Sequence, residues 1–137
     1  MNADALAGLY RDYIACLNRR DLDDLGAYVH DEARHNGRQL GVGGYRLMLQ
    51  KDFADIPDLR FDIELLVCQP PFVASRLRFD CTPKANFLGL AVNGVKVSFS
   101  ENVFYEFHDA RIIAVWSVID KTAIEAQLRQ DGAAGHS

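Results

Sequence analysis

The sequence predicts a single α+β domain in which N-terminal helices pack inside a strongly curved, mainly antiparallel sheet. Apolar residues recur every three or four positions in the first part of the chain, as on helices, and from Leu59 onward they alternate, as on strands. The length of 137 residues fits one domain, so residues 1–137 form the predicted unit. The strands are long enough to curl around the helices, and a sheet curled in this way encloses a cavity.

Three helices are expected before the strands, over the approximate ranges 3–19, 22–28 and 45–56. Each carries apolar residues spaced three and four apart on one face. Asp21 is well placed to cap the short second helix, and Pro57 ends the third because it disfavours helical geometry in the residue before it. The segment 30–44 holds four of the ten glycines and is expected to be irregular.

Four strands follow, over the approximate ranges 59–69, 72–81, 95–107 and 112–119. One face of the first strand is expected to be apolar, formed by Phe61, Ile63, Leu65 and Val67. The connection 84–94 is expected to be a loop, although an unusually apolar one. A last helix is predicted over 121–129, and residues 130–137 are expected to form a frayed tail.

Charge and composition exclude several classes of protein. The formal net charge is -4, and no basic cluster extends beyond Arg19-Arg20, so neither a nucleic-acid partner nor an acidic membrane surface is expected. The three cysteines are an odd number without CxxC spacing, which favours reduced core thiols in a cytoplasmic protein. No leader-like N-terminus and no apolar run of about 18 residues is present, so a cytoplasmic location without a membrane span is expected.

The sharpest local anomaly is a carboxylate on the apolar face of the third strand. The odd-numbered positions from Val95 to Phe107 are apolar except for Glu101. Burying an unpaired carboxylate is costly unless a partner or a raised pKa relieves it. A glutamate with a raised pKa inside a pocket is a usable general acid or base, which makes Glu101 the first catalytic candidate. A bulge at this position, or an ion pair with an arginine at an interface, are the alternatives.

His35 is the second catalytic candidate. It lies between the helices in Ala33–Gly37, where a short strand could point it inward, and a histidine can exchange protons near neutral pH. A hydrogen-bonded loop histidine is the alternative. No histidines or carboxylates show metal-ligand spacing, so no metal site is predicted.

Other residues are candidates for ligand contact, and each also has an alternative, purely structural role. Arg76 could anchor an anion or a carbonyl, or lie on a solvated sheet face. Tyr105 shares the face of the anomalous carboxylate and could present its phenol to a ligand, or be a core tyrosine. Trp116 and Asp120 occupy even-numbered positions, on the side of the strand opposite to Ser117. Asp120 also precedes the last helix, which indicates an N-cap. Ser117 has no histidine and aspartate nearby in sequence, so nucleophilic catalysis is not predicted.

Segments spread over nearly the whole chain, about Leu6 to Leu128, resemble one family in their order and spacing. They are Tyr28-Val29-His30, His35-Asn36, residues 53–59, 73–76, 86–90, Asn93-Gly94, residues 109–116, Asp120 and Gln127-Leu128. With these features the chain resembles the SnoaL-like polyketide (ester) cyclases, within the nuclear transport factor 2-like superfamily of cone-shaped α+β folds. The resemblance implies a closed pocket for a small hydrophobic, polyketide-like or cyclic molecule. The best-known members close a ring by intramolecular aldol chemistry without cofactor or metal.

In those members an aspartate acts as acid and base, with a histidine, a glutamine and an asparagine lining the site. Carried onto this chain, the aspartate position is Ser117, the histidine position is Val103 and the glutamine position is Glu101. The asparagine position falls at or beside His35-Asn36. We therefore expect a relocated acid/base pair, with Glu101 as base and His35 as its partner or as an electrophilic donor. The expected substrate contacts are Asn36, Arg76, Val103, Tyr105, Trp116, Ser117 and Asp120.

Three functions follow from these expectations. The first is a cofactor-independent cyclase- or isomerase-like enzyme, since the fold also hosts ketosteroid isomerase and scytalone dehydratase. The second is a non-catalytic small-molecule binding module, which the replaced aspartate and histidine favour. The third is an association module that dimerises through the outer sheet face. A homodimer is expected under all three.

Overall fold

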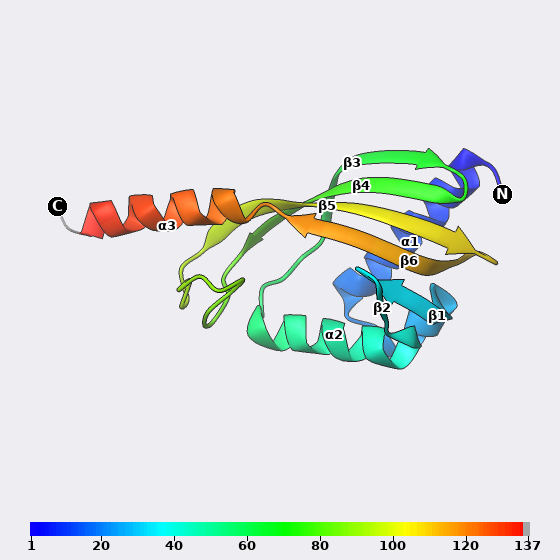
Figure 1. The fold of residues 1–137 in the computed structure, drawn as a ribbon, viewed down its shortest axis with the longest axis horizontal. Coiled ribbons are helices and arrows are strands. Elements are labelled where there is room, and N and C mark those ends of the chain that lie inside the picture. The colour runs from blue at the N-terminus through cyan, green and yellow to red at the C-terminus, as the bar shows by residue number, and fades with distance from the viewer. Residues whose placement is uncertain (136–137) are drawn as a thin grey trace.

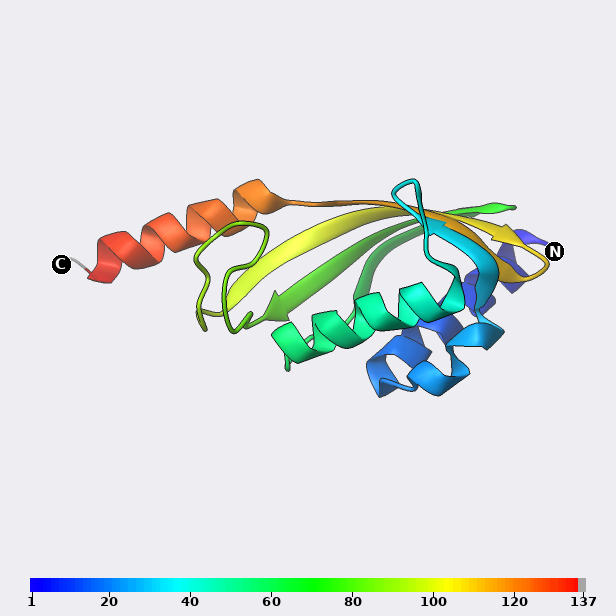
Figure 2. The same ribbon diagram turned by 60° about the horizontal axis from the view of Figure 1, so that its bottom comes forward.

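The computed structural model describes residues 1–135, with side chains described through residue 130. A six-stranded, open and curled sheet wraps around two helices that cover its concave face (Figures 1 and 2). The elements are α1 (Ala3–Arg19), the 3₁₀ helix η1 (Leu22–Ala27), β1 (Val29–His35), β2 (Arg38–Gln39), α2 (Gly41–Asp55), β3 (Asp62–Gln69), β4 (Phe72–Cys81), β5 (Val97–His108), β6 (Arg111–Ile119) and α3 (Lys121–Gly135). The predicted α+β class is confirmed. No helix within these residues is both long and apolar enough to cross a bilayer.

The sheet contains two strands beyond the four predicted ones, and the first of them is the short strand considered possible at His35. The strand order is β2-β1-β6-β5-β4-β3, and only β1 and β6 are parallel. Both β1 and β2 come from the segment expected to be irregular. β1 forms by pairing with a strand far along the chain, as in the bond from the Asn36 N–H to the Val115 carbonyl (2.8 Å). The local spacing of apolar residues does not reveal such a long-range partner.

The helices begin and end partly as expected. α1 has the predicted bounds, and Asn2 caps it by accepting a hydrogen bond from the Ala5 N–H (2.8 Å). α2 starts at Gly41, four residues before the expected Tyr45. Gly41 has a φ of +62°, and a Cβ there would lie 2.8 Å from the Asp31 carbonyl oxygen of β1.

α3 continues past the expected end at Arg129 as far as Gly135. The rest of the expected frayed tail, residues 136–137, lies outside the described residues. Ile124 is fully buried, and the Gln127 side chain exchanges hydrogen bonds with the backbone of Ser98 on β5. These contacts fix the first turns of α3, which extends beyond the sheet (Figure 1).

The apolar face predicted for the first strand is wrong beyond Ile63. The pairing register between β3 and β4 shifts between Ile63 and Leu65, which is a β-bulge. Because side chains alternate along a strand, one extra residue moves all later side chains to the opposite face. Leu65 and Val67 are consequently exposed, with 58% and 56% of their surface accessible, and Leu66 faces inward instead.

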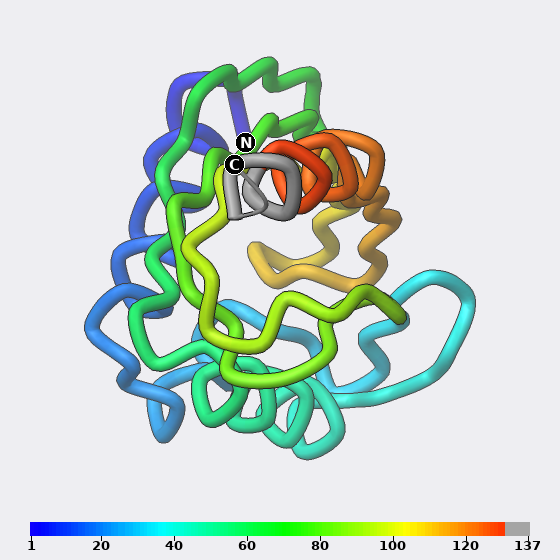
Figure 3. The backbone as a smooth tube through the Cα atoms, turned by 90° about the vertical axis from the view of Figure 1, so that its left-hand side faces the viewer, coloured from blue at the N-terminus to red at the C-terminus, as the bar shows by residue number. Residues whose placement is uncertain are grey.

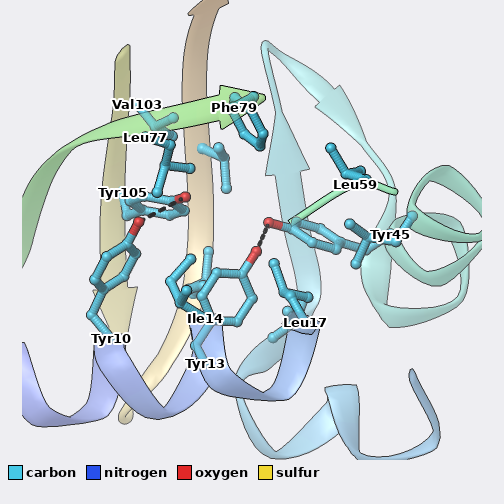
Figure 4. Close-up of a cluster of buried hydrophobic side chains, with 14 of the residues drawn as sticks. Tyr10, Tyr13, Ile14, Leu17, Tyr45, Leu59, Leu77, Phe79, Val103 and Tyr105 are labelled. Atoms are coloured by element: carbon cyan, nitrogen blue, oxygen red, sulfur yellow. Dashed lines mark hydrogen bonds between the residues drawn. The ribbon is translucent and has the colours of Figure 1, made fainter. Parts of the chain in front are cut away.

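The core lies between the concave face of the sheet and α1. Along α1 the buried side chains Leu6, Tyr10, Tyr13 and Leu17 follow the helical repeat. Two pairs of phenol hydroxyls join α1 to its neighbours: Tyr10 donates to Tyr105 of β5 (3.3 Å), and Tyr13 pairs with Tyr45 of α2 (2.6 Å) (Figure 4). Each pair satisfies polar groups that burial would otherwise leave without a partner.

The bulge makes a testable prediction about stability. Leu77 of β4 is 1% exposed, so Leu77→Ala should lower the free energy of unfolding by about 2–5 kcal/mol. The matched change Leu65→Ala on the outer face should cost less than about 1 kcal/mol. Denaturant unfolding of the two variants measures both values. Equal losses would contradict the bulge and restore the unbroken alternation.

Candidate functional site

A cavity of about 450 Å³ opens between the concave face of the sheet, α1 and α2. Its walls are mainly apolar and include Leu17, Leu49, Leu77, Val103 and Val115. Seen along the long axis, the loop that follows β4 lies across the space between α2 and the sheet (Figure 3). Leu88 of this loop lines the cavity. A mostly apolar cavity with a few polar groups is the usual form of a small-molecule site.

The structure brings most of the sequence-predicted site residues to this cavity. Its lining includes His35, Asn36, Glu101, Val103, Tyr105 and Ser117. They converge because β1, β5 and β6 are neighbours in the sheet and present these positions to the concave side.

Arg76, Trp116 and Asp120 lie elsewhere, which corrects their expected place in the site. Arg76 is on the outer face of β4, where it donates to Asn102 (3.0 Å) and approaches Glu64 (3.4 Å). Trp116 is on the outer face of β6 and 45% exposed, because its parity is opposite to that of the cavity-lining Ser117. The Asp120 carboxylate accepts from the Ala123 N–H (3.2 Å), which makes it the N-cap of α3.

Glu101 projects from the concave face of β5 into the cavity, between its strand neighbours Leu77 and Ile119. Within the described part of the chain no group donates a hydrogen bond to its carboxylate. Its pKa is raised to about 7, mainly by burial and to a lesser extent by the nearby charge of Asp52. The carboxyl can therefore take up and release a proton near neutral pH.

His35 ends β1 at the rim of the cavity, with its ring edge-on to Tyr45 (6.4 Å between ring centroids). Burial lowers the pKa of the imidazole, and the charge of Arg38 lowers it further. A neutral imidazole donates from one nitrogen and accepts at the other. Among the described residues His35 and Glu101 are not hydrogen-bonded to each other, so any cooperation between them passes through a ligand.

Asn36 holds the end of β1 next to His35. Its side-chain carbonyl accepts from the Ser117 N–H (2.9 Å), and its amide donates weakly toward the Ser117 carbonyl and hydroxyl oxygens, at 3.4 Å each. These bonds tie β1 to β6 and so fix the position of His35.

Asp52 of α2 also lines the cavity, although the sequence analysis did not select it. Burial raises the pKa of its carboxyl to about 6, with Asp55 adding to the effect and Lys51 opposing it. The signal was present in the sequence: Asp52 follows Met48 by four positions and Leu49 by three, so it lies on the apolar face of the helix. It is the same kind of anomaly as Glu101, hidden in a run with other charged residues.

The paired hydroxyls of Tyr13 and Tyr45 also belong to cavity-lining residues. Burial raises the pKa of both phenols, so they stay protonated at neutral pH. One proton lies between the two oxygens, which leaves the other free to be donated to a ligand oxygen.

A smaller recess of about 60 Å³ continues from the cavity. Four phenylalanines wall it: Phe61, Phe79, Phe87 and Phe99. Asp52 and Glu101 line both spaces and thus stand where they join.

Known proteins agree with this architecture. A SnoaL-like polyketide cyclase from Agrobacterium tumefaciens strain C58 has 54% sequence identity to this chain. Its crystal structure matches with a TM-score of 0.90, over 93% of this chain and 99% of that one. TsrD from Streptomyces laurentii is 21% identical with a TM-score of 0.80, over 93% of this chain and 97% of its own. IdmH from Streptomyces antibioticus is 20% identical with a TM-score of 0.76, over 90% and 97% respectively.

The last two likenesses show the shared fold. No protein with a curated description matches the sequence. The profile of the SnoaL-like polyketide cyclase family matches residues 7–128, which is most of the chain. The chain therefore belongs to the SnoaL-like polyketide cyclase family.

Proposed function

We propose that this protein is a cofactor-independent acid/base enzyme that acts on a small hydrophobic, polyketide-like or cyclic molecule by cyclase- or isomerase-type chemistry. The observation that carries the proposal is the carboxyl of Glu101, which faces a mainly apolar cavity, lacks a hydrogen-bond partner in the described chain and titrates near neutral pH. Membership of the family supports the class of chemistry.

In this proposal the ionised Glu101 removes a proton from a carbon next to a substrate carbonyl. Negative charge then develops on the carbonyl oxygen, and a donor aimed at that oxygen lowers the barrier. The Tyr13–Tyr45 pair and the neutral His35, which line the same cavity, can supply such donors. Val103, Tyr105 and Ser117 contact the substrate, and Asn36 positions His35.

A non-catalytic binding protein is the second candidate. It is favoured by Ser117 and Val103, which stand where the family resemblance implies the aspartate and the histidine. Both candidates need the cavity, and they differ in whether a bound molecule exchanges protons with Glu101.

Proton exchange on a cyclic ketone separates these candidates. 2-Tetralone, a bicyclic aromatic ketone with acidic α-protons, serves as the probe in deuterated buffer, with NMR as the readout. The catalysed exchange rate should rise as the pH approaches about 7, because ionised Glu101 is the base. Glu101→Gln should lower the rate by about 10²–10⁴-fold.

The matched control is Glu106→Gln, which makes the same change on the outer side of the same strand. It should leave the exchange rate unchanged. Binding of the ketone without catalysed exchange, or exchange that survives in Glu101→Gln, would refute Glu101 as the base. The first of these results would favour the binding protein.

Stability should depend on pH in a way that needs no substrate. The pKa of Glu101 rises from 4.5 to about 7 on folding, so the folded state holds a proton that the unfolded state has lost in this range. The Glu101 contribution to stability is therefore complete below about pH 4.5 and is lost as pH rises to about 7. The loss amounts to about 3 kcal/mol at most.

Gln at this position cannot ionise, so Glu101→Gln avoids this loss and should be more stable than the wild type at pH 8, with little difference at pH 4.5. Denaturant unfolding at both pH values gives the comparison, and Asp12→Asn, at an exposed position of α1, reports the effect of net charge alone. A Glu101→Gln variant that is less stable than the wild type at pH 8 would show that the carboxylate is structurally paired.

We also propose that the outer sheet face binds a second copy of the chain. Paired residues form an apolar row across four strands, Val67, Ala74, Phe104 and Trp116, with Leu65 and Val118 beside it. Phe104 and Val118 are 59% and 71% exposed. The row is bordered by residues of both charge signs, including Glu64, Arg76, Arg78 and Glu106, which suits a two-fold contact of the face with itself.

Phe104→Asp places a charge at the centre of this row and should weaken self-association by at least about tenfold, because the charge would be buried between the copies. Light scattering after size-exclusion chromatography measures the mass. Leu47→Asp, an equally exposed apolar site on α2, should leave the dimer intact. A wild-type chain that stays monomeric at high concentration would refute this proposal.

A further inference from the structure

We propose that Asp52 is the second proton-transfer group of the site and that it shares one proton with Glu101 near neutral pH, so that the pair offers an acid and a base together. The chemical use of the pair rests on the proposed acid/base function, whereas the existence of the pair is tested separately.

The two carboxyls lie on opposite walls of one junction. Glu101 projects from β5 and Asp52 from α2, which packs over the concave face. Four side chains line both the cavity and the phenylalanine recess: Asp52, Phe61, Glu101 and Ile119. In the described chain the junction thus consists of two carboxyls and two apolar side chains.

No cation neutralises the pair at this junction within the described residues. Lys51, the neighbour of Asp52, instead forms an ion pair with Asp55 in solvent (2.5 Å), and Asp55 adds a further negative charge nearby. The other ionisable groups around the cavity are the neutral His35 of β1 and Lys121 at the start of α3, besides the tyrosine phenols. Two ionised carboxylates in this setting would repel each other, so one proton is retained near neutral pH.

Carboxylates with a structural role in this chain differ from Asp52 and Glu101 because they accept hydrogen bonds. Asp58 accepts hydrogen bonds from the Thr82 N–H (2.8 Å) and hydroxyl (2.9 Å), and these bonds help to lower its pKa despite the opposing effect of desolvation. Asp120 caps a helix. In the described chain neither Asp52 nor Glu101 has a side-chain hydrogen bond or an ion pair, so no structural partner accounts for their burial.

The singly protonated pair can supply both the base and the acid of a complete proton-transfer step. The ionised member takes a proton from the substrate carbon while the protonated member gives its proton to the carbonyl oxygen, which yields the neutral enol. The pair then still holds one proton, now on the other carboxyl. Return of a proton to a different carbon, with the enol proton taken back, completes an isomerisation. In a ring closure the enol carbon attacks a second carbonyl, the protonated carboxyl gives its proton to that carbonyl oxygen, and the ionised carboxyl takes the enol proton, so the pair again holds one proton.

Carbon-detected NMR titration of the side-chain carboxyls tests the pair without any substrate. In Asp52→Asn the titration midpoint of Glu101 should fall by at least about half a pH unit, because the neighbouring negative charge is gone. Glu101→Gln is the reciprocal variant: a fall in the midpoint of Asp52 reports the same coupling, which keeps the test available if Asp52→Asn does not fold. Asp55→Asn, on the solvent side of the same helix, should leave the midpoint of Glu101 unchanged.

Unchanged midpoints in both pair variants would overturn the inference. Its failure is distinct from failure of the proposed function. Exchange of 2-tetralone with uncoupled titrations would keep Glu101 as a lone base and overturn the pair. Coupled titrations, together with a bell-shaped pH profile of exchange that loses one limb in Asp52→Asn, would support it.

Discussion

Loss of water from the concave face of the sheet is the constraint on which the rest of this structure depends. α1 and α2 cover this face, so most inward positions of β4, β5 and β6 lose contact with solvent when the chain folds. For Val103 or Leu77 that loss is favourable. For Glu101 it favours the protonated form, since burial is the main cause of its raised pKa. The packing that stabilises the fold is thus the same packing that brings this carboxyl into a useful pH range.

Paired phenols provide hydrogen-bond partners for buried hydroxyls on the same face. Tyrosines fill large volumes against α1, but a buried hydroxyl without a partner costs about 1–3 kcal/mol. The chain pairs Tyr10 with Tyr105 and Tyr13 with Tyr45, so three elements are fixed together without any charge entering the core (Figure 4). Since Tyr13 and Tyr45 also line the cavity, the groups that hold α2 in place are available to a ligand.

The sequence was sufficient where structure depends on local repeats, and insufficient where it depends on distant partners. The helix α1, the strands β4 to β6 and the inward position of Glu101 all follow from periodicity. β1 depends on its pairing with the distant β6 as well as with β2, and the bulge after Ile63 turns Leu65 outward without a change in composition. Asp52 lies on the apolar face of α2 but stands beside other charged residues, which hid it from a reading of the sequence.

The sheet register explains how the ionisable group can stand at a new position without a change of fold. Ser117, where the family resemblance implies an acid, lies directly opposite Val103, and Glu101 is two residues further along the same face of β5. Such diagonal neighbours are about 7–8 Å apart, which is within the reach of one bound molecule. A carboxyl at Glu101 therefore serves the same cavity as one at Ser117 would, but it also lines the phenylalanine recess. Asp52 lines both spaces as well, so in our proposal the displaced acid acts with a partner on the helix.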